Sequence, residues 1–360
     1  HADMMKVYDA AVGVDSDQRW LRKVGGSGTN ADRVASLILQ VQLCPVFATG
    51  HIKTLLNMAA QTTRGDSTLA MDGLKDLFLT TLLPDRKLKT LAQMEPVSPK
   101  AVSASTFTEI CVIAYFEDFL KTVFAAFVQT IAEVSHCQVF HFRAKAISTA
   151  YDLLVAKPEQ EHALLALLVN KFGDAKPKYI CRKASNCVAK LVQSHPGMKA
   201  VVVREMETFL ARPHLMQRAR FEVLQHLAEM EFDDSDAELG AKLMRMFVTQ
   251  LESVLNKNKK KTPKSGVRIQ HHHGLRIKVR RPKMKVRKLP YGVFSYSALD
   301  EEDNRLVQVL VTGIQRTLPS MQGSLVRTSL AEDTTNALFR ICHTVSAFSA
   351  RIAILTLLYR

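Results

Sequence analysis

Residues 143–172 read RAKAISTAYDLLVAKPEQEHALLALLVNKF, and residues 181–210 read CRKASNCVAKLVQSHPGMKAVVVREMETFL. The second stretch begins 38 residues after the first, and at this offset Leu153 aligns with Leu191 and Pro158 with Pro196. Each stretch reads as a helix, a tight turn containing proline and a second helix. A period near 40 residues with two antiparallel helices is typical of HEAT-like repeats, whose apolar faces are buried only when neighbouring repeats stack.

The rest of the 360-residue chain shows the same helical periodicity outside one basic stretch. We expect a helix capped by Asn30, a second opened by Asp66 and ending near Pro84, and a long one from Ser105 to about Val134, with one possible break. No strand-rich stretch of similar length occurs. The sequence therefore predicts an all-α fold, a HEAT/armadillo-like α-solenoid of stacked antiparallel helix pairs with a basic extended insertion.

Three domains follow from this pattern. We expect a helical solenoid over residues 1–255, a basic linker or extended arm over 256–290 and a C-terminal helical part over 291–360. No apolar stretch approaches the roughly 18 residues that span a bilayer, so no membrane association is expected. The six cysteines form no CxxC pair, which favours buried thiols in a reducing compartment.

The positive charge of the chain is concentrated in one segment. The formal net charge is +15, yet no acid occurs between Glu252 and Asp300, and without the 14 cations of this gap the chain has 35 basic and 34 acidic residues. The cations are Lys257, Lys259, Lys260, Lys261, Lys264, Arg268, Arg276, Lys278, Arg280, Arg281, Lys283, Lys285, Arg287 and Lys288. Such a block attracts a polyanion by counterion release, so we predict that it binds RNA. A solvated linker or a localisation signal remains the alternative.

The two halves of this basic segment differ. Residues 256–265 are lysine-rich and polar, so we expect them to be disordered. Residues 275–289 alternate apolar and basic side chains, which indicates an extended strand or ribbon interrupted by Pro282. No aromatic residue occurs before Tyr291, which favours phosphate contact over base stacking.

Signs of catalysis or metal binding are weak throughout. His136, Cys137 and His141 lie close together, but their spacing lacks a second cysteine pair and favours a core or boundary role. Glu117 and Asp118 are adjacent on a predicted helix and point different ways, so they do not form an acid/base pair. We expect neither an enzyme nor a bound cofactor or metal.

Two smaller groups of cations allow two interpretations each. Arg86, Lys87 and Lys89 follow Pro84, and they either contact a phosphate or partner or form a solvated turn. Arg143, Lys145, Arg182 and Lys183 recur at the repeat interval, and they form either a basic ridge along the repeats or a solvated face.

The predicted last helix, about Phe348 to Tyr359, is apolar around nearly its whole circumference. A helix of this kind must be buried on more than one side. We predict a partner surface here, carried by Ile352, Ile354, Leu355 and Leu358. The competing interpretation is that the helix folds back into the body of the protein.

Several blocks of the chain resemble a known family. They are DGLKDLFLTTLLPDRKLKTL at residues 72–91, AYDLLVAKPEQEHALLALLVNKFGD and HPGMKAVVVREME within residues 114–210, LVTGIQRTLPS at 310–320 and NALFRICHTVSAFSARIAILTLLYR at 336–360. Together they resemble the CCAAT-binding-factor domain family, and within it the branch of nucleolar complex protein one. The block at residues 312–319 departs from the TGVNRAFP usual in the family, and its acidic tracts are absent.

The resemblance implies a function that the spacing arguments do not. Members of the family are described as α-solenoid scaffolds of early large-subunit ribosome assembly in the nucleolus. They pair with nucleolar complex protein two and bind precursor ribosomal RNA. We therefore expect a non-enzymatic assembly factor that acts in the nucleus or nucleolus in heteromeric complexes with precursor ribosomal RNA, nucleolar complex protein two and other pre-60S factors. The alternative is a protein-only adaptor or transcription cofactor.

Overall fold

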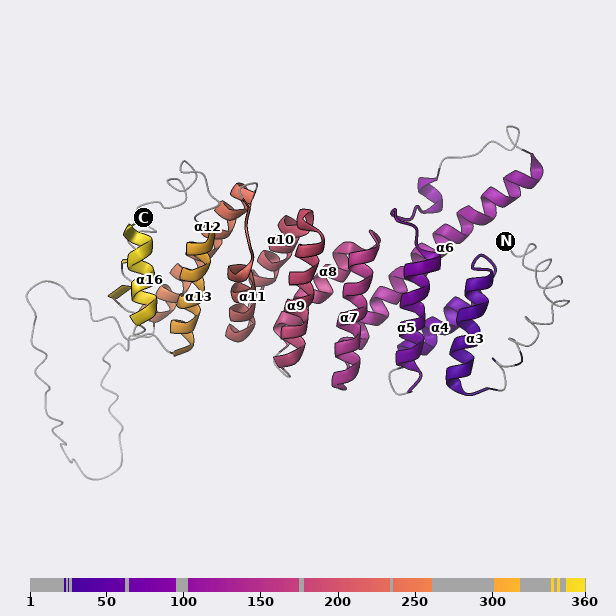
Figure 1. Ribbon diagram of the computed structural model, residues 1–360, viewed down its shortest axis with the longest axis horizontal. Coiled ribbons are helices and arrows are strands. Elements are labelled where there is room, and N and C mark those ends of the chain that lie inside the picture. Colours follow the sequence, from indigo (N-terminus) through magenta and orange to yellow (C-terminus); the bar gives the residue numbers. More distant parts are fainter. Residues whose placement is uncertain are drawn as a thin grey trace, which may run out of the picture. The chain divides into compact units, whose positions relative to one another are not determined.

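The computed structural model describes residues 28–61, 65–94, 103–174, 178–233, 236–260, 301–317 and 348–359, with a few isolated residues besides (Figure 1). Every regular element within these ranges is helical, which confirms the predicted all-α class. The chain divides into two compact units between Val223 and Leu224, and each is described by itself. The three-part division expected from the sequence stays a prediction.

The first unit is a succession of helices joined by short turns. Its elements are α3 (Asn30–Leu43), α4 (Thr49–Ala60), α5 (Ser67–Leu77), the π-helical turn η1 (Phe78–Leu82), the 3-10 turn η2 (Leu91–Gln93), α6 (Ala104–Val134), α7 (Phe140–Ala156), α8 (Glu161–Asn170), η3 (Lys171–Gly173), α9 (Lys178–Ser194), η4 (Pro196–Met198), α10 (Lys199–Leu210) and the start of α11 (Gln217–Glu229).

Short polar side chains fix where these helices begin. Thr29, not Asn30 as expected, caps α3, because its side chain accepts from the backbone N–H of Asp32 while Asp32 accepts from the backbone N–H of Thr29. Ser103 caps α6 by accepting from Thr106 N. Helix α6 then continues unbroken for 31 residues, so the possible break is absent.

The two repeat units identified in the sequence are neighbours in one core. Helix α7 packs against α9, and α8 packs against α9 and α10 (Figure 1). The aligned residues Leu153 and Leu191 are both fully buried. Pro158 and Pro196 each lie two residues beyond the end of a helix, which is where a residue that cannot continue the helix is tolerated. The prediction that residues 143–172 and 181–210 form neighbouring helical units is therefore confirmed.

An aromatic cluster fills the interior beside α6. The ring of Phe78 lies 5.0 Å from that of Phe124 and 5.3 Å from that of Phe127, and all three side chains are fully buried. Phe78 begins the π-helical turn that ends α5, and the other two rings lie one turn apart on α6. The cluster joins the end of α5 to the middle of α6 and so positions the segment between them.

The second unit is built on α12 (Ala237–Lys260), α13 (Glu301–Thr317) and α16 (Phe348–Tyr359). Helix α13 packs against both α12 and α16. Gly313 of α13 lies directly over the buried ring of Phe247, where a Cβ atom would be 2.7 Å from Cε2. Helix α12 extends to Lys260, so the expectation of disorder from Asn256 onward is wrong for residues 256–260.

No helix in the described part of the chain is both long and apolar enough to cross a bilayer.

Candidate functional site

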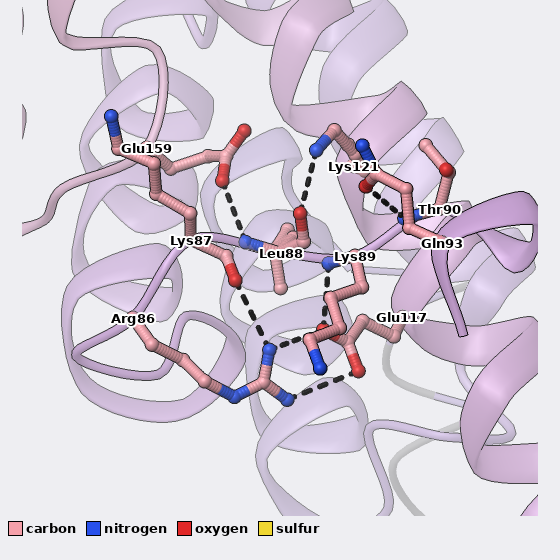
Figure 2. A network of polar contacts seen from close by, with 9 residues as sticks. All are labelled: Arg86, Lys87, Leu88, Lys89, Thr90, Gln93, Glu117, Lys121 and Glu159. Carbon is pink, nitrogen blue, oxygen red and sulfur yellow. Dashed lines mark hydrogen bonds and ion pairs between the residues drawn. The ribbon is translucent and has the colours of Figure 1, made fainter. Parts of the chain in front are cut away.

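A dense network of polar contacts surrounds the extended segment 85–91, which we call the clamped segment (Figure 2). The segment follows the proline of the LLPDRKL block; residues 85–90 belong to no helix, and Leu91 begins the 3-10 turn η2. Four consecutive backbone N–H groups, from Leu88 to Leu91, nevertheless donate hydrogen bonds to side chains. Side chains therefore satisfy the backbone here in the way that a helix or sheet does elsewhere.

Glu117 of α6 holds the outer side of the clamped segment. One carboxylate oxygen accepts from the backbone N–H of Lys89 at 2.8 Å, and the carboxylate forms a two-pronged ion pair with the Arg86 guanidinium, with Nη2–Oε2 at 3.1 Å (Figure 2). These contacts, led by the hydrogen bond from Arg86, hold the pKa of Glu117 below its ordinary value. The neighbouring Asp118 accepts from the backbone N–H of Leu91 at 3.1 Å.

Glu159 and Lys121 hold the inner side. Leu88 is 3% exposed, and its backbone N–H donates to Glu159 Oε2 at 2.8 Å. Its carbonyl accepts from Lys121 Nζ at 2.6 Å (Figure 2). Glu159 itself is only 5% exposed, so its hydrogen bond to the backbone is formed in the interior. The clamp thus links α6 to the turn that precedes α8.

A left-handed residue directs Glu159 inward. Gln160, the residue before α8, has a φ of 55°, which non-glycine residues adopt only at a cost. The chain bends at Glu159 and Gln160 and then enters α8. The turn of the KPEQE block therefore places the buried carboxylate of Glu159 where it accepts a hydrogen bond from the backbone N–H of Leu88.

Two of the three cations of the clamped segment form ion pairs within the protein. Arg86 pairs with Glu117 and Lys87 with Glu161, while Asp85 pairs with Lys157. Of the two interpretations left open for this block, the geometry favours a structured turn over a free phosphate contact. The sequence reasoning missed Glu159 and Lys121, and it considered Glu117 and Asp118 only as an acid/base pair.

The cations that recur at the repeat interval divide into two classes. On α7, Arg143 pairs with Asp174 at 3.3 Å and Lys145 pairs with Asp72. On α9, Arg182 is exposed, and neither it nor Lys183 forms an ion pair with a described residue. The α7 half of the predicted ridge is thus neutralised.

Lys171, which the sequence analysis did not single out, lies in the core near the ion pair of Arg143 with Asp174. Lys171 is 1% exposed, and its Nζ donates to the carbonyl of Ser135 at 2.9 Å. The same Nζ lies 3.9 Å from Asp174 Oδ2, in an ion pair. Burial lowers the pKa of this amine. The contact joins the end of α8 to the turn between α6 and α7, so Lys171 has a structural role.

Most of the predicted RNA-binding segment lies outside the described residues. The backbone of Lys257, Lys259 and Lys260 continues α12, and Lys261, Lys264, Arg268, Arg276, Lys278, Arg280, Arg281, Lys283, Lys285, Arg287 and Lys288 lie outside the described ranges. The RNA contact therefore stays a prediction.

The predicted partner residues do not share one environment. Ile352 and Leu355 are 47% and 52% exposed, whereas Ile354 is fully buried. The side chain of Leu358 lies outside the described residues. Helix α16 therefore buries one side within its own unit while Ile352 and Leu355, together with the exposed Phe348, form an open apolar stripe. The burial of Ile354 removes it from any surface that a partner could contact.

No group of three or more metal-binding side chains is found among the described residues, and His136, Cys137 and His141 form none. Burial raises the pKa of Cys181 to about 12, so its thiol is a core group and not a nucleophile.

Comparison with known proteins identifies relatives of this chain. The chain is 33% identical over 233 residues to human CCAAT/enhancer-binding protein zeta, covering 63% of this chain and 22% of the relative. It is 26% identical over 369 residues to ribosome biogenesis protein NOC1 of Chaetomium thermophilum, covering 98% and 34% respectively. It is 29% identical over 221 residues to nucleolar complex protein 1 of Drosophila melanogaster, covering 60% and 19%.

This chain is a homologue of CCAAT/enhancer-binding protein zeta and nucleolar complex protein 1. The resemblance seen in the sequence motifs is thereby confirmed. No model of a protein family matches the chain. The chain spans about a fifth to a third of the length of these three relatives. Their names refer to the nucleolus, to ribosome biogenesis and to CCAAT/enhancer binding, and none is the name of an enzyme.

Proposed function

We propose that this protein is a non-enzymatic scaffold of large ribosomal subunit assembly that acts in nucleolar pre-60S particles. The observation that carries the proposal is the packing of the α7–α8 pair against the α9–α10 pair, in a chain whose relatives are named for ribosome biogenesis and the nucleolus. Stacked helix pairs of this kind are the unit of a HEAT-like solenoid, which offers extended binding surfaces in place of a catalytic cleft.

The scaffold would bind precursor ribosomal RNA through the 14 cations of residues 257–288. An acid-free block with this charge supports contact with the phosphate backbone irrespective of sequence. Neutralising Lys278, Arg280, Arg281, Lys283 and Lys285 together should weaken binding to all RNAs alike and reduce the salt slope by about one unit per lost contact. Loss of binding to one RNA sequence alone would contradict this mechanism.

The scaffold would also bind a protein partner through α16, which by family resemblance is nucleolar complex protein two. Phe348, Ile352 and Leu355 are exposed at a helical spacing, which supports an apolar contact surface. Replacing Ile352 and Leu355 with Asp should abolish co-purification and leave the helical circular dichroism unchanged. The matched control is Ile354→Asp, which should unfold the second unit because Ile354 is core.

The assembly role is tested by tagging the protein in cells and analysing what co-sediments with it. Co-sedimentation with large-subunit precursors and accumulation of unprocessed ribosomal RNA on depletion are expected. The second candidate is a protein-only adaptor or transcription cofactor, which the name of the CCAAT/enhancer-binding relative favours. Association with chromatin, normal RNA processing and no RNA affinity would establish that candidate instead.

A further inference from the structure

Helix α9 has the composition of a nucleic-acid-binding helix although it lies far along the chain from the basic segment. No acid occurs from residue 175 to residue 204, and α9 alone carries Lys178, Arg182, Lys183 and Lys190. None of these four forms an ion pair with a described residue. Helix α9 thus concentrates four cations, unpaired within the described part of the chain, in a protein body that is otherwise nearly neutral.

The polar residues of α9 lie on one face. At 100° per residue, the side chains from Lys178 to Gln193 that point away from the core occupy an arc of about 140°. This face, which we call the α9 face, consists of Lys178, Tyr179, Arg182, Lys183, Asn186, Ala189, Lys190 and Gln193. Ile180, Val188 and Leu191 are fully buried on the opposite side. The cations are therefore presented together along about 18 Å of helix.

Three acids that lie close to α9 are already paired with other cations. Asp174 pairs with Arg143, Asp152 pairs with Lys75 and Glu222 pairs with Arg218. The positive field of the α9 face is thus not cancelled by these neighbouring acids.

An exposed aromatic pair lies at the N-terminal end of the same face. Tyr179 is 53% exposed and its ring lies 5.2 Å from that of Phe140, which is 43% exposed at the start of α7. Helices α7 and α9 are neighbours (Figure 1). Open aromatic rings beside cations are the combination on which unpaired nucleobases stack. Asn186 and Gln193 add amide groups that donate to phosphate or sugar oxygens.

We infer that the α9 face is a second RNA-binding surface, one that takes single-stranded RNA along α9 with a base stacked at Tyr179. This inference rests on the proposed RNA-binding function and adds a site to it. The aromatic pair and the amides favour RNA over an acidic protein, for which the four cations alone would suffice. The basic segment supplies phosphate contact without aromatics, whereas the α9 face adds base stacking.

The test measures the affinity of the full chain for a 20-nucleotide single-stranded RNA by fluorescence anisotropy across a salt series. Lys178→Gln, Arg182→Gln and Lys190→Gln together should lower the affinity at least about tenfold and flatten the salt slope by about two. Tyr179→Ala should weaken single-stranded RNA about tenfold and leave double-stranded RNA unaffected. Ultraviolet crosslinking should map to the peptide containing Tyr179.

A matched control removes the same charge from exposed cations elsewhere in the first unit, with Arg33→Gln, Lys53→Gln and Lys89→Gln. This control should bind like the unmodified chain. If the α9 triple variant also binds like the unmodified chain while the basic-segment variant fails, the α9 inference is overturned and the proposed function survives. If the unmodified chain binds no RNA, both are overturned. If the α9 variant loses affinity for polyglutamate but not for RNA, the surface is an acidic-protein site.

Discussion

Replacing Glu159 with Ala should open the clamped segment locally. The carboxylate of Glu159 is the acceptor for the buried backbone N–H of Leu88, at 2.8 Å. Losing a hydrogen bond to a charged acceptor and orphaning a buried donor each cost about 1–3 kcal/mol, and removing a buried carboxylate offsets part of this. We expect a net loss of about 2 kcal/mol. Glu159→Gln should cost less, because the amide oxygen still accepts the bond.

Hydrogen exchange read by mass spectrometry over residues 83–94 measures this loss directly. A cost of about 2 kcal/mol corresponds to roughly 30-fold faster exchange of the protected amides in this segment. The control is Lys87→Ala, which breaks the exposed ion pair with Glu161 in the same segment and should change exchange by less than about twofold. Unchanged protection in Glu159→Ala would show that the bond to Glu159 is not needed to hold the segment, and that the contacts with α6 and the packing of Leu88 suffice.

Two close glycine contacts, a buried imidazole and a left-handed residue each allow a test by substitution. In chemical unfolding, Gly313→Ala should destabilise the second unit by about 1–3 kcal/mol, because the added Cβ would meet the rigid ring of Phe247. The control Gly73→Ala should change the stability by no more than about 1 kcal/mol, because only the flexible end of Ile38 must move. Burial lowers the pKa of His226 to about 4, so as the pH falls the imidazole is protonated in the unfolded chain before it is protonated in the folded one. Up to about 3 kcal/mol of folding stability should therefore be lost between pH 6.5 and pH 4. The melting temperature of His226→Gln should depend less on pH over this range. Gln160→Gly should raise stability by about 1 kcal/mol and Gln160→Val should lower it, since only glycine adopts the observed φ of 55° freely.

The sequence predicted the helical repeat well because the repeat is a local pattern. Leu153 and Leu191 recur at a fixed interval, and the prolines that follow their helices mark the ends of both. The cap of α3 was misplaced by one residue because Thr29 and Asn30 are both good caps, and only the reciprocal bond with Asp32 decides between them.

The clamp around Leu88 could not be predicted, because it joins three separate parts of the chain: the clamped segment itself, α6 and the turn before α8. Glu117, Lys121 and Glu159 each read as an ordinary surface residue of a helix or turn. Their convergence depends on how α6 and α8 pack, which no spacing along the chain encodes. The sequence predicted part of the α9 face, since Arg182 and Lys183 recur with the cations of α7 at the repeat interval. Only the structure shows that the α7 cations form ion pairs and that those of α9 form none with a described residue.

The clamped segment also has a consequence for the order in which the chain folds. The bond from Leu88 to Glu159 joins residues 71 apart, whereas the helix pairs of the repeats close over a few turn residues. Local pairs form first and distant contacts form late, because the distant ones must first overcome the entropy of closing a long loop. At synthesis rates of about 5–20 residues per second, Leu88 must wait roughly 4–14 s for its acceptor to leave the ribosome. During that interval the backbone N–H of Leu88 can bond only to solvent, so the clamp is completed after translation has passed the turn before α8.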